Sequence, residues 1–320
     1  MRKRWRVTCC HWMVKKNIEN VLQKDRFTMN RRQFIQRGTL AIAGTAVALP
    51  ALAKGSRNRI GLQLYTLRDI ITKDPKSVLK QVADLGYQDL EVYGYNDGML
   101  FGMKSKEFAN YVRSLGMKIT SGHYQLGKNE QTAKMKGTIL NGWEQACADA
   151  KETGQEFMVV AYLNADERQT IDDYRFVCDE MNRASLVCKK YGIKLQYHNH
   201  DFEFQKFDGV VAYDVMLKQL DSKLVGMELD LYWTVFAGIN PTDLFAKYPG
   251  RFQQWHIKDM DKIDRKKNAI VGTGSIDFKS LLTHAKEAGL KHWYMEHDSY
   301  PEGMSSSDSV KADVAYLKTF

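Results

Sequence analysis

The chain has 320 residues and a formal net charge of +9 at pH 7. Residues 1–53 carry all of this excess, because they hold 11 of the 47 Lys and Arg but only two of the 38 Asp and Glu. The remaining chain has 36 basic and 36 acidic residues, so its charge gives no indication of a nucleic-acid or membrane-surface partner.

The first 53 residues have the layout of a bacterial Tat export signal. A twin arginine, Arg31-Arg32, precedes an uncharged run from Gly38 to Ala53 that ends in Ala51-Leu52-Ala53. The alternative is a membrane anchor, but the apolar run has about 15 residues where a spanning helix needs about 20. We therefore predict cleavage after Ala53, a periplasmic mature protein, and one domain at residues 54–320. Such signals normally begin where Met29 stands. Residues 1–28 therefore have a second interpretation, in which the true start codon is that of Met29.

From Arg59 onward, short β-rich apolar runs alternate with amphipathic segments eight times. The expected strands are Ile60–Tyr65, Leu90–Tyr93, Lys118–Gly122, Phe157–Tyr162, Lys194–His198, Val225–Asp230, Gln253–Lys258 and Trp293–His297. The expected helices are Ser77–Leu85, Lys106–Leu115, Gln131–Thr153, Ile171–Tyr191, Val211–Leu220, Pro241–Tyr248, Asp277–Ala288 and Ser306–Phe320.

This alternation predicts a single-domain α/β protein, a (β/α)₈ TIM barrel, whose typical length is ~250 residues. A doubly wound open sheet is the competing fold. It would require a glycine-rich phosphate loop after the first strand, and Gln63–Arg68 is not glycine-rich.

Ionisable and aromatic residues gather where successive predicted strands end. Chemistry in a TIM barrel takes place at this carboxyl edge. Glu203, Asp230, His256 and Glu296 offer three carboxylates and one imidazole without sulfur. Such a set suits one divalent ion, with Mn²⁺, Mg²⁺, Co²⁺, Fe²⁺ and Zn²⁺ all open.

The chain resembles the xylose isomerase-like TIM barrels, the family of sugar phosphate isomerases/epimerases to which endonuclease IV is distantly related. The motifs that carry the resemblance are Tyr197-His-Asn-His-Asp-Phe-Glu-Phe204, Glu228-Leu-Asp230, His256-Ile-Lys-Asp259, Val271-Gly-Thr-Gly-Ser-Ile-Asp277 and Glu296. The resemblance implies one divalent metal held by Asp230, His256 and Glu296. The fifth strand departs from the common pattern, because His198 stands where the family has Glu. Glu203 is then the expected fourth ligand, and the His-x-His variant is similar to inosose dehydratase and to lyases of 3-keto-glycosides.

The other candidate residues have both functional and structural interpretations. His198 and His200 are candidates for the general base and for a residue that orients the metal site, and either assignment is open. Lys258 is a candidate to stabilise an enolate oxygen, or else a paired structural lysine. The strand-mouth residues expected to contact sugar hydroxyls are Tyr65, Glu91, His123 and Trp233.

These residues predict a metal-dependent sugar isomerase or epimerase that abstracts a proton next to a carbonyl and forms an enediolate. The same intermediate serves a lyase or dehydratase of keto-sugars or 3-keto-glycosides, which is the alternative. Export favours a substrate without phosphate. Two rivals remain: a periplasmic sugar-binding protein with a decayed metal site, and a phosphodiester hydrolase resembling endonuclease IV. A homo-oligomer is also open, and no nucleic-acid or membrane partner is expected after processing.

Overall fold

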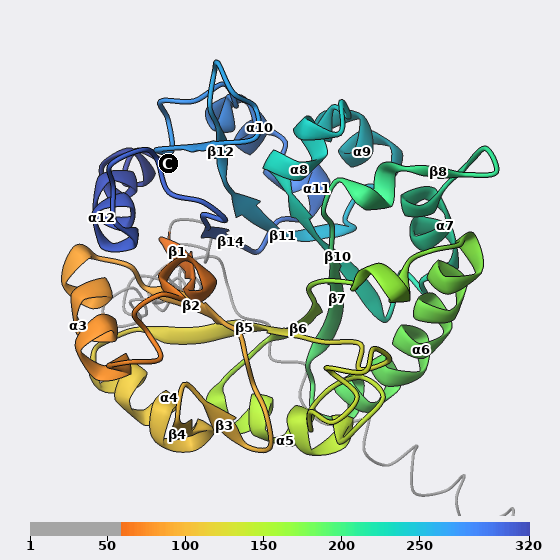
Figure 1. The fold of residues 1–320 in the computed structure, drawn as a ribbon, viewed down its shortest axis with the longest axis horizontal. Coiled ribbons are helices and arrows are strands. Elements are labelled where there is room, and N and C mark those ends of the chain that lie inside the picture. Colours follow the sequence, from red (N-terminus) through yellow and green to blue (C-terminus); the bar gives the residue numbers. More distant parts are fainter. Residues whose placement is uncertain (1–58) are drawn as a thin grey trace, which may run out of the picture. The chain divides into compact units, whose positions relative to one another are not determined.

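In the computed structural model, residues 59–320 are described, and the predicted export signal at residues 1–53 lies outside them. Eight parallel strands close into a barrel in the order β1-β14-β11-β10-β7-β6-β5-β2, and Figure 1 shows the helices as a ring around it. This confirms the predicted TIM barrel. The barrel strands are β1 (Gly61–Gln63), β2 (Asp89–Val92), β5 (Lys118–Tyr124), β6 (Phe157–Val160), β7 (Lys194–His198), β10 (Val225–Asp230), β11 (Phe252–Ile257) and β14 (His292–Met295).

Each predicted helix has a counterpart in the structure, and most agree closely in their bounds. The helices are α3 (Pro75–Leu85), α4 (Ser105–Ser114), α5 (Trp143–Thr153), α6 (Ile171–Lys190), α7 (Ala212–Gln219), α8 (Leu231–Phe236), α9 (Pro241–Lys247), α10 (Phe278–Thr283), α11 (Ala285–Ala288) and α12 (Ser306–Leu317). Short 3₁₀ turns are η2 (Leu64–Leu67), η3 (Ala165–Glu167) and η4 (Phe202–Phe204). Within residues 59–320, no helix combines the length and the hydropathy that crossing a membrane requires.

The prediction of one long helix over Gln131–Thr153 is wrong in its first half. Helix α5 begins only at Trp143, and residues 131–142 form a loop after β5. Gly137 and Gly142 have φ values of 101° and 74°, which an α-helix does not accommodate. The backbone amide of Ile139 donates to the carbonyl of Gln125 at 3.0 Å, so the loop folds back on the end of β5.

Three two-stranded sheets, which the sequence did not predict, lie in the connections between barrel elements. They pair β3 (Met99–Leu100) with β4 (Met103–Lys104), β8 (Lys206–Phe207) with β9 (Val210–Val211), and β12 (Asp259–Met260) with β13 (Asn268–Ala269). Each strand has only two residues, too few for a periodicity to be visible in the sequence.

Alternation along the strands separates an apolar outer layer from a polar barrel interior. Successive side chains of a strand point to opposite faces. On β11, Trp255 faces outward and stacks on Phe245 of α9 with ring centroids 4.9 Å apart. His256, the next residue, therefore points into the barrel.

The strand register brings the polar side chains of neighbouring strands together. Asp230 of β10 pairs with His256 of β11, and Glu228 pairs with His198 of β7. Glu228 and Asp230 are two residues apart and share the inner face. The barrel mouth therefore gathers imidazoles and carboxylates from strands that are distant in sequence.

Candidate active site

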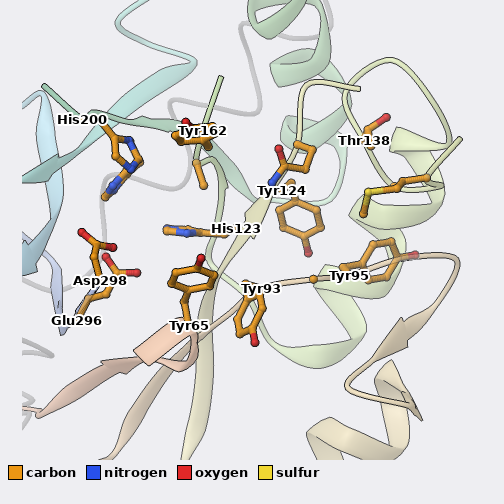
Figure 2. Close-up of a pocket in the computed structure, with 16 residues that line it drawn as sticks. Tyr65, Tyr93, Tyr95, His123, Tyr124, Thr138, Tyr162, His200, Glu296 and Asp298 are labelled. Carbon is orange, nitrogen blue, oxygen red and sulfur yellow. The ribbon is translucent and has the colours of Figure 1, made fainter. Parts of the chain in front are cut away.

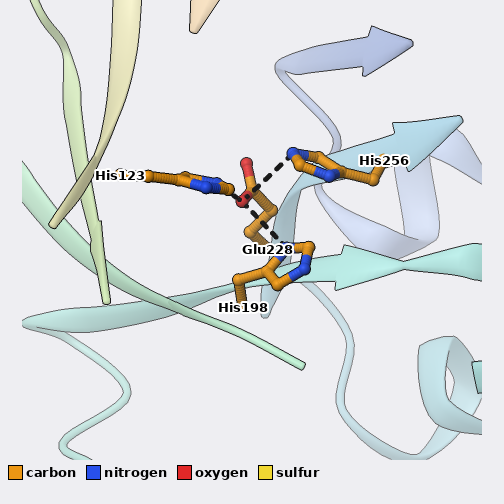
Figure 3. Close-up of side chains that lie close together, drawn as sticks. All are labelled: His123, His198, Glu228 and His256. Carbon is orange, nitrogen blue, oxygen red and sulfur yellow. Dashed lines mark hydrogen bonds and ion pairs between the residues drawn. The ribbon is translucent and has the colours of Figure 1, made fainter. Parts of the chain in front are cut away.

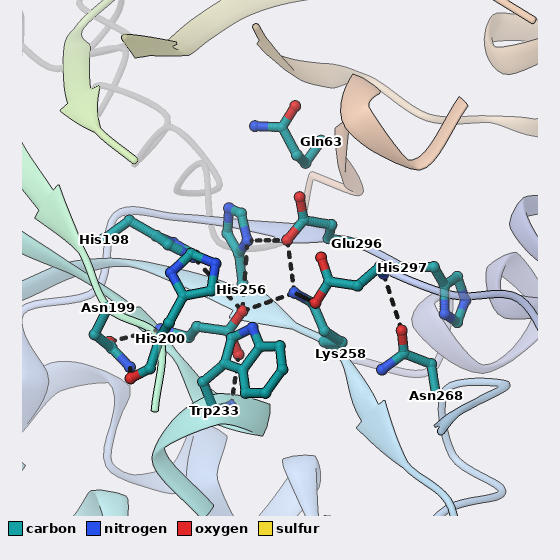
Figure 4. Close-up of polar contacts among 12 residues, drawn as sticks. Gln63, His198, Asn199, His200, Trp233, His256, Lys258, Asn268, Glu296 and His297 are labelled. Carbon is teal, nitrogen blue, oxygen red and sulfur yellow. Dashed lines mark hydrogen bonds and ion pairs between the residues drawn. The ribbon is translucent and has the colours of Figure 1, made fainter. Parts of the chain in front are cut away.

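Four buried side chains converge at the carboxyl edge of the barrel, three from strands and one from the residue that follows β14. They are His198, Asp230, His256 and Glu296, and one nitrogen or oxygen atom of each lies within 4.8 Å of the others. Figure 4 shows His256 between His198 and Glu296. His256 Nδ1 lies 2.9 Å from Glu296 Oε2. The structure thus brings together three of the four expected metal ligands, and the fourth member of the group is His198.

Glu203 is not part of this group, and its expected role as the fourth ligand finds no support in its position. Its Oε1 accepts a 2.5 Å hydrogen bond from the Tyr197 hydroxyl, and its Oε2 accepts one of 2.8 Å from the backbone N–H of His200. Tyr197 alternates with the inward-facing His198, so its side chain points out of the barrel. Through these two hydrogen bonds, Glu203 lies outside the barrel beside Tyr197 and holds the segment that follows β7 in place.

Three imidazoles surround one carboxylate in a second group, which shares two histidines with the first. Glu228 Oε2 lies 2.9 Å from His123 Nε2, 3.1 Å from His198 Nδ1 and 3.4 Å from His256 Nε2. Figure 3 shows the three rings converging on this oxygen. His123 was expected to contact substrate, and the structure places it against Glu228 while it also lines the central cavity.

Glu91 does not lie where the sequence analysis expected it. Instead of facing a substrate, it is fully buried inside the barrel, where it accepts hydrogen bonds from Gln63 Nε2 at 2.7 Å and Ser121 Oγ at 2.6 Å. Burial opposes its ionisation, but His123 and His256 hold the pKa of Glu91 below its usual value. Glu91 therefore holds His123 and His256 in position from inside the barrel, on the side away from its mouth.

Lys258 lies among three carboxylates beside the metal-ligand candidates. Its Nζ is 2.6 Å from Asp298 Oδ2, 2.9 Å from Glu296 Oε2 and 3.0 Å from Asp230 Oδ2. Burial alone would lower the pKa of Lys258, but these carboxylates raise it well above the usual value. A fixed ammonium charge consequently stands next to the cluster.

His200 presents a free ring nitrogen beside the cluster. Its ring stacks on Phe202 with centroids 5.3 Å apart, and its Nδ1 is buried without a hydrogen-bond partner among residues 59–320. Burial, and then the nearby Lys258 charge, lower the pKa of His200 to about 3. The imidazole is therefore neutral at pH 7.

A cavity of about 470 Å³ opens next to the cluster, and Figure 2 shows the side chains that line it. The lining includes five residues singled out from the sequence, Tyr65, His123, His198, His200 and Glu296. Trp233, also expected at a sugar, is absent from this lining. Its ring packs 5.6 Å from His200 and 5.7 Å from Lys258 Nζ, so it supports the two residues.

The glycine-containing loop Val271–Asp277 is held by a buried carboxylate. Asp259 accepts hydrogen bonds from the backbone N–H groups of Gly272, Gly274 and Ile276 at 2.9, 2.9 and 3.2 Å. A Cβ on Gly274 would lie 2.3 Å from Asp259 Oδ1, so a side chain would prevent this approach. Because these amides are engaged, the loop is not a phosphate cradle.

The first group has the donors that a divalent metal requires. It offers two imidazoles and two carboxylates, a set that suits Zn²⁺, Fe²⁺, Co²⁺ and Mn²⁺. Asp230 Oδ2 is buried and accepts no hydrogen bond within residues 59–320, although Lys258 Nζ lies 3.0 Å away. Such an oxygen is available to a cation.

Sequence reasoning missed Glu228 and Asp298 as members of the site. Each lies two residues from an assigned ligand on the same strand or its extension, so the two-residue period of a strand places it on the same face. The Glu228-Leu-Asp230 and Glu296-His-Asp298 spacings carried this signal.

Comparisons with known proteins agree with the fold. The family described as xylose isomerase-like TIM barrel matches residues 79–320. Inosose dehydratase from Geobacillus kaustophilus is 22% identical over 258 residues, which are 71% of this chain and 80% of that protein.

Among solved structures, a sugar phosphate isomerase/epimerase from Parabacteroides distasonis is 29% identical. The match covers 84% of this chain and 96% of that one, with a TM-score of 0.69. The IolI protein, whose structure contains a bound zinc atom, is 15% identical, with coverage of 80% and 95% and a TM-score of 0.63. At that identity the likeness concerns the fold alone.

Proposed function

We propose, since the chain belongs to the xylose isomerase-like TIM barrel family, that it is a divalent-metal-dependent enzyme that removes a proton next to a carbonyl of a sugar or keto-sugar. The observation that carries the proposal is the convergence of His198, Asp230, His256 and Glu296 within 4.8 Å, at the barrel edge where chemistry takes place in this fold. An intact ligand set argues against a sugar-binding protein with a decayed site.

The residues around the cluster divide the chemical work. His198, Asp230, His256 and Glu296 would hold the ion, which supplies a Lewis acid that polarises a carbonyl and its neighbouring hydroxyl. His200 takes the proton from the carbon between these oxygens, because its neutral Nδ1 has no other partner. Lys258 stabilises the negative oxygen of the resulting enediolate with its fixed charge.

Two outcomes follow from the same enediolate. Return of the proton to carbon gives isomerisation or epimerisation, in keeping with the name of the Parabacteroides neighbour. Loss of a group from the next carbon gives elimination, in keeping with the inosose dehydratases. Isomerisation is the primary proposal and elimination the alternative.

We further propose that the substrate carries no phosphate and that the enzyme works in the periplasm. Of the described residues that line the cavity, none is Lys or Arg, whereas Glu296 and Asp298 are acidic. A phosphate group would face repulsion there, and the amides of Val271–Asp277 are already bonded to Asp259. Periplasmic location rests on the Arg31-Arg32 signal alone.

Exchange of substrate hydrogen with solvent tests the proposal. Protein loaded with Mn²⁺ is incubated in D₂O with free sugars and with 3-keto-glucose, and deuterium at the carbon next to the carbonyl is followed by NMR. We expect exchange with the wild type and a loss of at least about 100-fold in His200→Gln. The control His284→Gln alters a half-exposed histidine bonded to Glu287 and should exchange normally. Absence of stoichiometric metal together with absence of exchange would refute the proposal.

A further inference from the structure

The two groups of potential metal ligands lie at different depths in the barrel. We call His198, Asp230, His256 and Glu296 the outer group, and His123, His198, Glu228 and His256 the inner group. A strand rises about 3.3 Å per residue, so Glu228, two residues before Asp230 on β10, lies about 6–7 Å further from the mouth. The inner group is therefore a distinct set of donors, although it has two histidines in common with the outer group.

The donors of the inner group have the spacing of ligands around one ion. Glu228 Oε2 lies 2.9, 3.1 and 3.4 Å from nitrogens of His123, His198 and His256, and Figure 3 shows the three rings around it. Ligands at 2.0–2.1 Å from a tetrahedral zinc ion are about 3.3 Å apart. The other oxygen, Glu228 Oε1, is buried and accepts no hydrogen bond within residues 59–320, so it is available to a cation.

Glu91 brings a second carboxylate to the inner group. Its Oε2 lies 3.0 Å from His123 Nε2 and 2.7 Å from His256 Nε2. Glu91 and Glu228 are both fully buried, and their ion-pair partners within residues 59–320 are histidines. Two buried carboxylates that face the same imidazoles match the charge of one divalent ion.

His198 and His256 turn a different ring nitrogen to each group. His198 Nδ1 lies 3.1 Å from Glu228 Oε2, whereas its Nε2 lies 3.7 Å from Asp230 Oδ2. His256 Nε2 lies 3.4 Å from Glu228 Oε2, whereas its Nδ1 lies 2.9 Å from Glu296 Oε2. A neutral imidazole has one lone pair and one N–H group, so each ring binds an ion on one side and donates a hydrogen bond on the other.

This property of the two rings allows one ion at a time. With the ion in the outer group, the N–H groups of the shared histidines point to Glu228 and Glu91. With the ion in the inner group, they are on the opposite nitrogens and point to Asp230 and Glu296. Both arrangements leave each ring with a hydrogen-bond acceptor, whereas two ions at once would require both rings to lose their last proton.

The charge of Lys258 distinguishes the two groups. Its Nζ lies 3.0 Å from Asp230 Oδ2 and 2.9 Å from Glu296 Oε2, so the ammonium already neutralises part of the outer carboxylate charge. It also repels a second cation at this distance. The carboxylates of Glu91 and Glu228 pair with histidines instead, and a histidine that binds an ion is neutral. The inner carboxylates therefore offer their charge to an ion.

We propose that the inner group is a second metal site, which binds Zn²⁺ in alternation with the outer group. Imidazole nitrogens suit Zn²⁺ and carboxylates suit Mn²⁺, and the inner group has three nitrogens where the outer group has two. Four protein ligands around zinc form a closed site, without the open position that a substrate needs. Zinc there also takes both shared histidines from the outer group, so it switches off the metal-dependent reaction. Only this last consequence rests on the proposed function.

X-ray absorption spectroscopy of the wild type counts the imidazoles around the bound ion. We expect three imidazoles in protein loaded with one equivalent of Zn²⁺ and two in protein loaded with Mn²⁺. Elemental analysis should give one ion per chain in each case, and also when both metals are supplied together. Two imidazoles around zinc would overturn the inner site, and two ions per chain would overturn the alternation.

A pair of variants tests the two groups separately, with affinities measured by competition with a chelating dye. His123→Gln removes a ligand of the inner group only and should weaken Zn²⁺ binding by at least about 10-fold, while Mn²⁺ binding changes by less than about 3-fold. Asp230→Asn should have the opposite effect. The control His284→Gln alters a half-exposed histidine and should change neither affinity. Equal losses of both metals in His123→Gln would make His123 a support of the outer group and overturn the proposal. The wild-type spectra decide the question if this variant does not fold.

Deuterium exchange separates this inference from the proposed function. One equivalent of Zn²⁺ added to the Mn²⁺-loaded wild type should stop the exchange, and continued exchange at full zinc occupancy would overturn the alternation. Absence of exchange with Mn²⁺ alone would refute the proposed function, while three imidazoles around zinc would still establish the inner site. Normal exchange with Mn²⁺ and two imidazoles around zinc would do the reverse.

Discussion

Replacement of Glu203 by Gln tests whether this residue has a structural role or is a metal ligand. The carboxyl is fully buried behind β7, with Tyr197 and the His200 amide as its hydrogen-bond donors. Burial raises the pKa of Glu203 from 4.5 to about 7. The folded protein therefore holds the proton more tightly than the unfolded chain, and ionisation of Glu203 opposes folding.

The sign and size of the effect follow from this pKa. Because the folded pKa is the higher one, the contribution of Glu203 is fully present below pH 4.5 and is lost as the pH rises to about 7. A shift of about 2.5 units corresponds to about 3 kcal/mol. The amide of Gln does not titrate, so between pH 5 and 8 the free energy of unfolding of Glu203→Gln should gain about 2–3 kcal/mol relative to the wild type.

Urea unfolding with EDTA present measures this difference without interference from bound metal. The matched control is Glu302→Gln, which alters an acid with a 94% exposed side chain and should show no such trend. Metal stoichiometry of the loaded protein should be the same in Glu203→Gln and the wild type. A fall in stoichiometry would refute the structural role and restore Glu203 as a ligand, and a pH-independent difference would refute the raised pKa.

Four further changes test other parts of the molecule. Asp230→Asn removes a ligand carboxylate and should weaken Mn²⁺ binding by more than about 100-fold, as measured by competition with a chelating dye. Lys258→Met removes the charge beside the enediolate and should lower kcat about 10²–10³-fold while one metal ion per chain remains by elemental analysis. Asp259→Asn weakens the bonds to the Val271–Asp277 loop and should lower the free energy of unfolding by about 1–3 kcal/mol in urea. Changing Arg31 and Arg32 to Lys should retain the protein in the cytoplasm, and unchanged export in cell fractionation would contradict the Tat assignment.

The barrel and most of its active edge are predictable because they depend on periodicity. The bounds of β7 and β10 agree with the sequence to the residue, since apolar and polar residues alternate up to His198 and Asp230. Parallel closure then brings the strand ends together, so Asp230, His256 and Glu296 were foreseeable as one cluster.

Positions beyond a strand end are not predictable in this way. Glu203 lies in the turn η4, which directs its carboxyl back to Tyr197, and no periodicity describes that turn. The helix prediction for residues 131–142 was wrong for a related reason. Apolar spacing suggested a helix, whereas Gly137 and Gly142 adopt positive φ values that a helix does not allow. The prediction that Glu91 contacts substrate was wrong because alternation along a strand shows which face a side chain occupies. It does not show how far below the barrel mouth the side chain lies.

The segment from Tyr197 to Phe204 divides three tasks among three residues, and this division depends on the histidine at position 198. In the proposed site, two carboxylates, Asp230 and Glu296, would balance the charge of a divalent ion, and His198 and His256 would complete the ligand set. A glutamate in place of His198 would add a third negative charge and a built-in base. With His198 as a neutral ligand the base must come from elsewhere, and His200 lies beside the cluster with an unpartnered nitrogen. Glu203 then holds the backbone of His200 from the outer side of the strand. In the proposed mechanism the base is therefore separate from the metal ligands, and it lines the cavity.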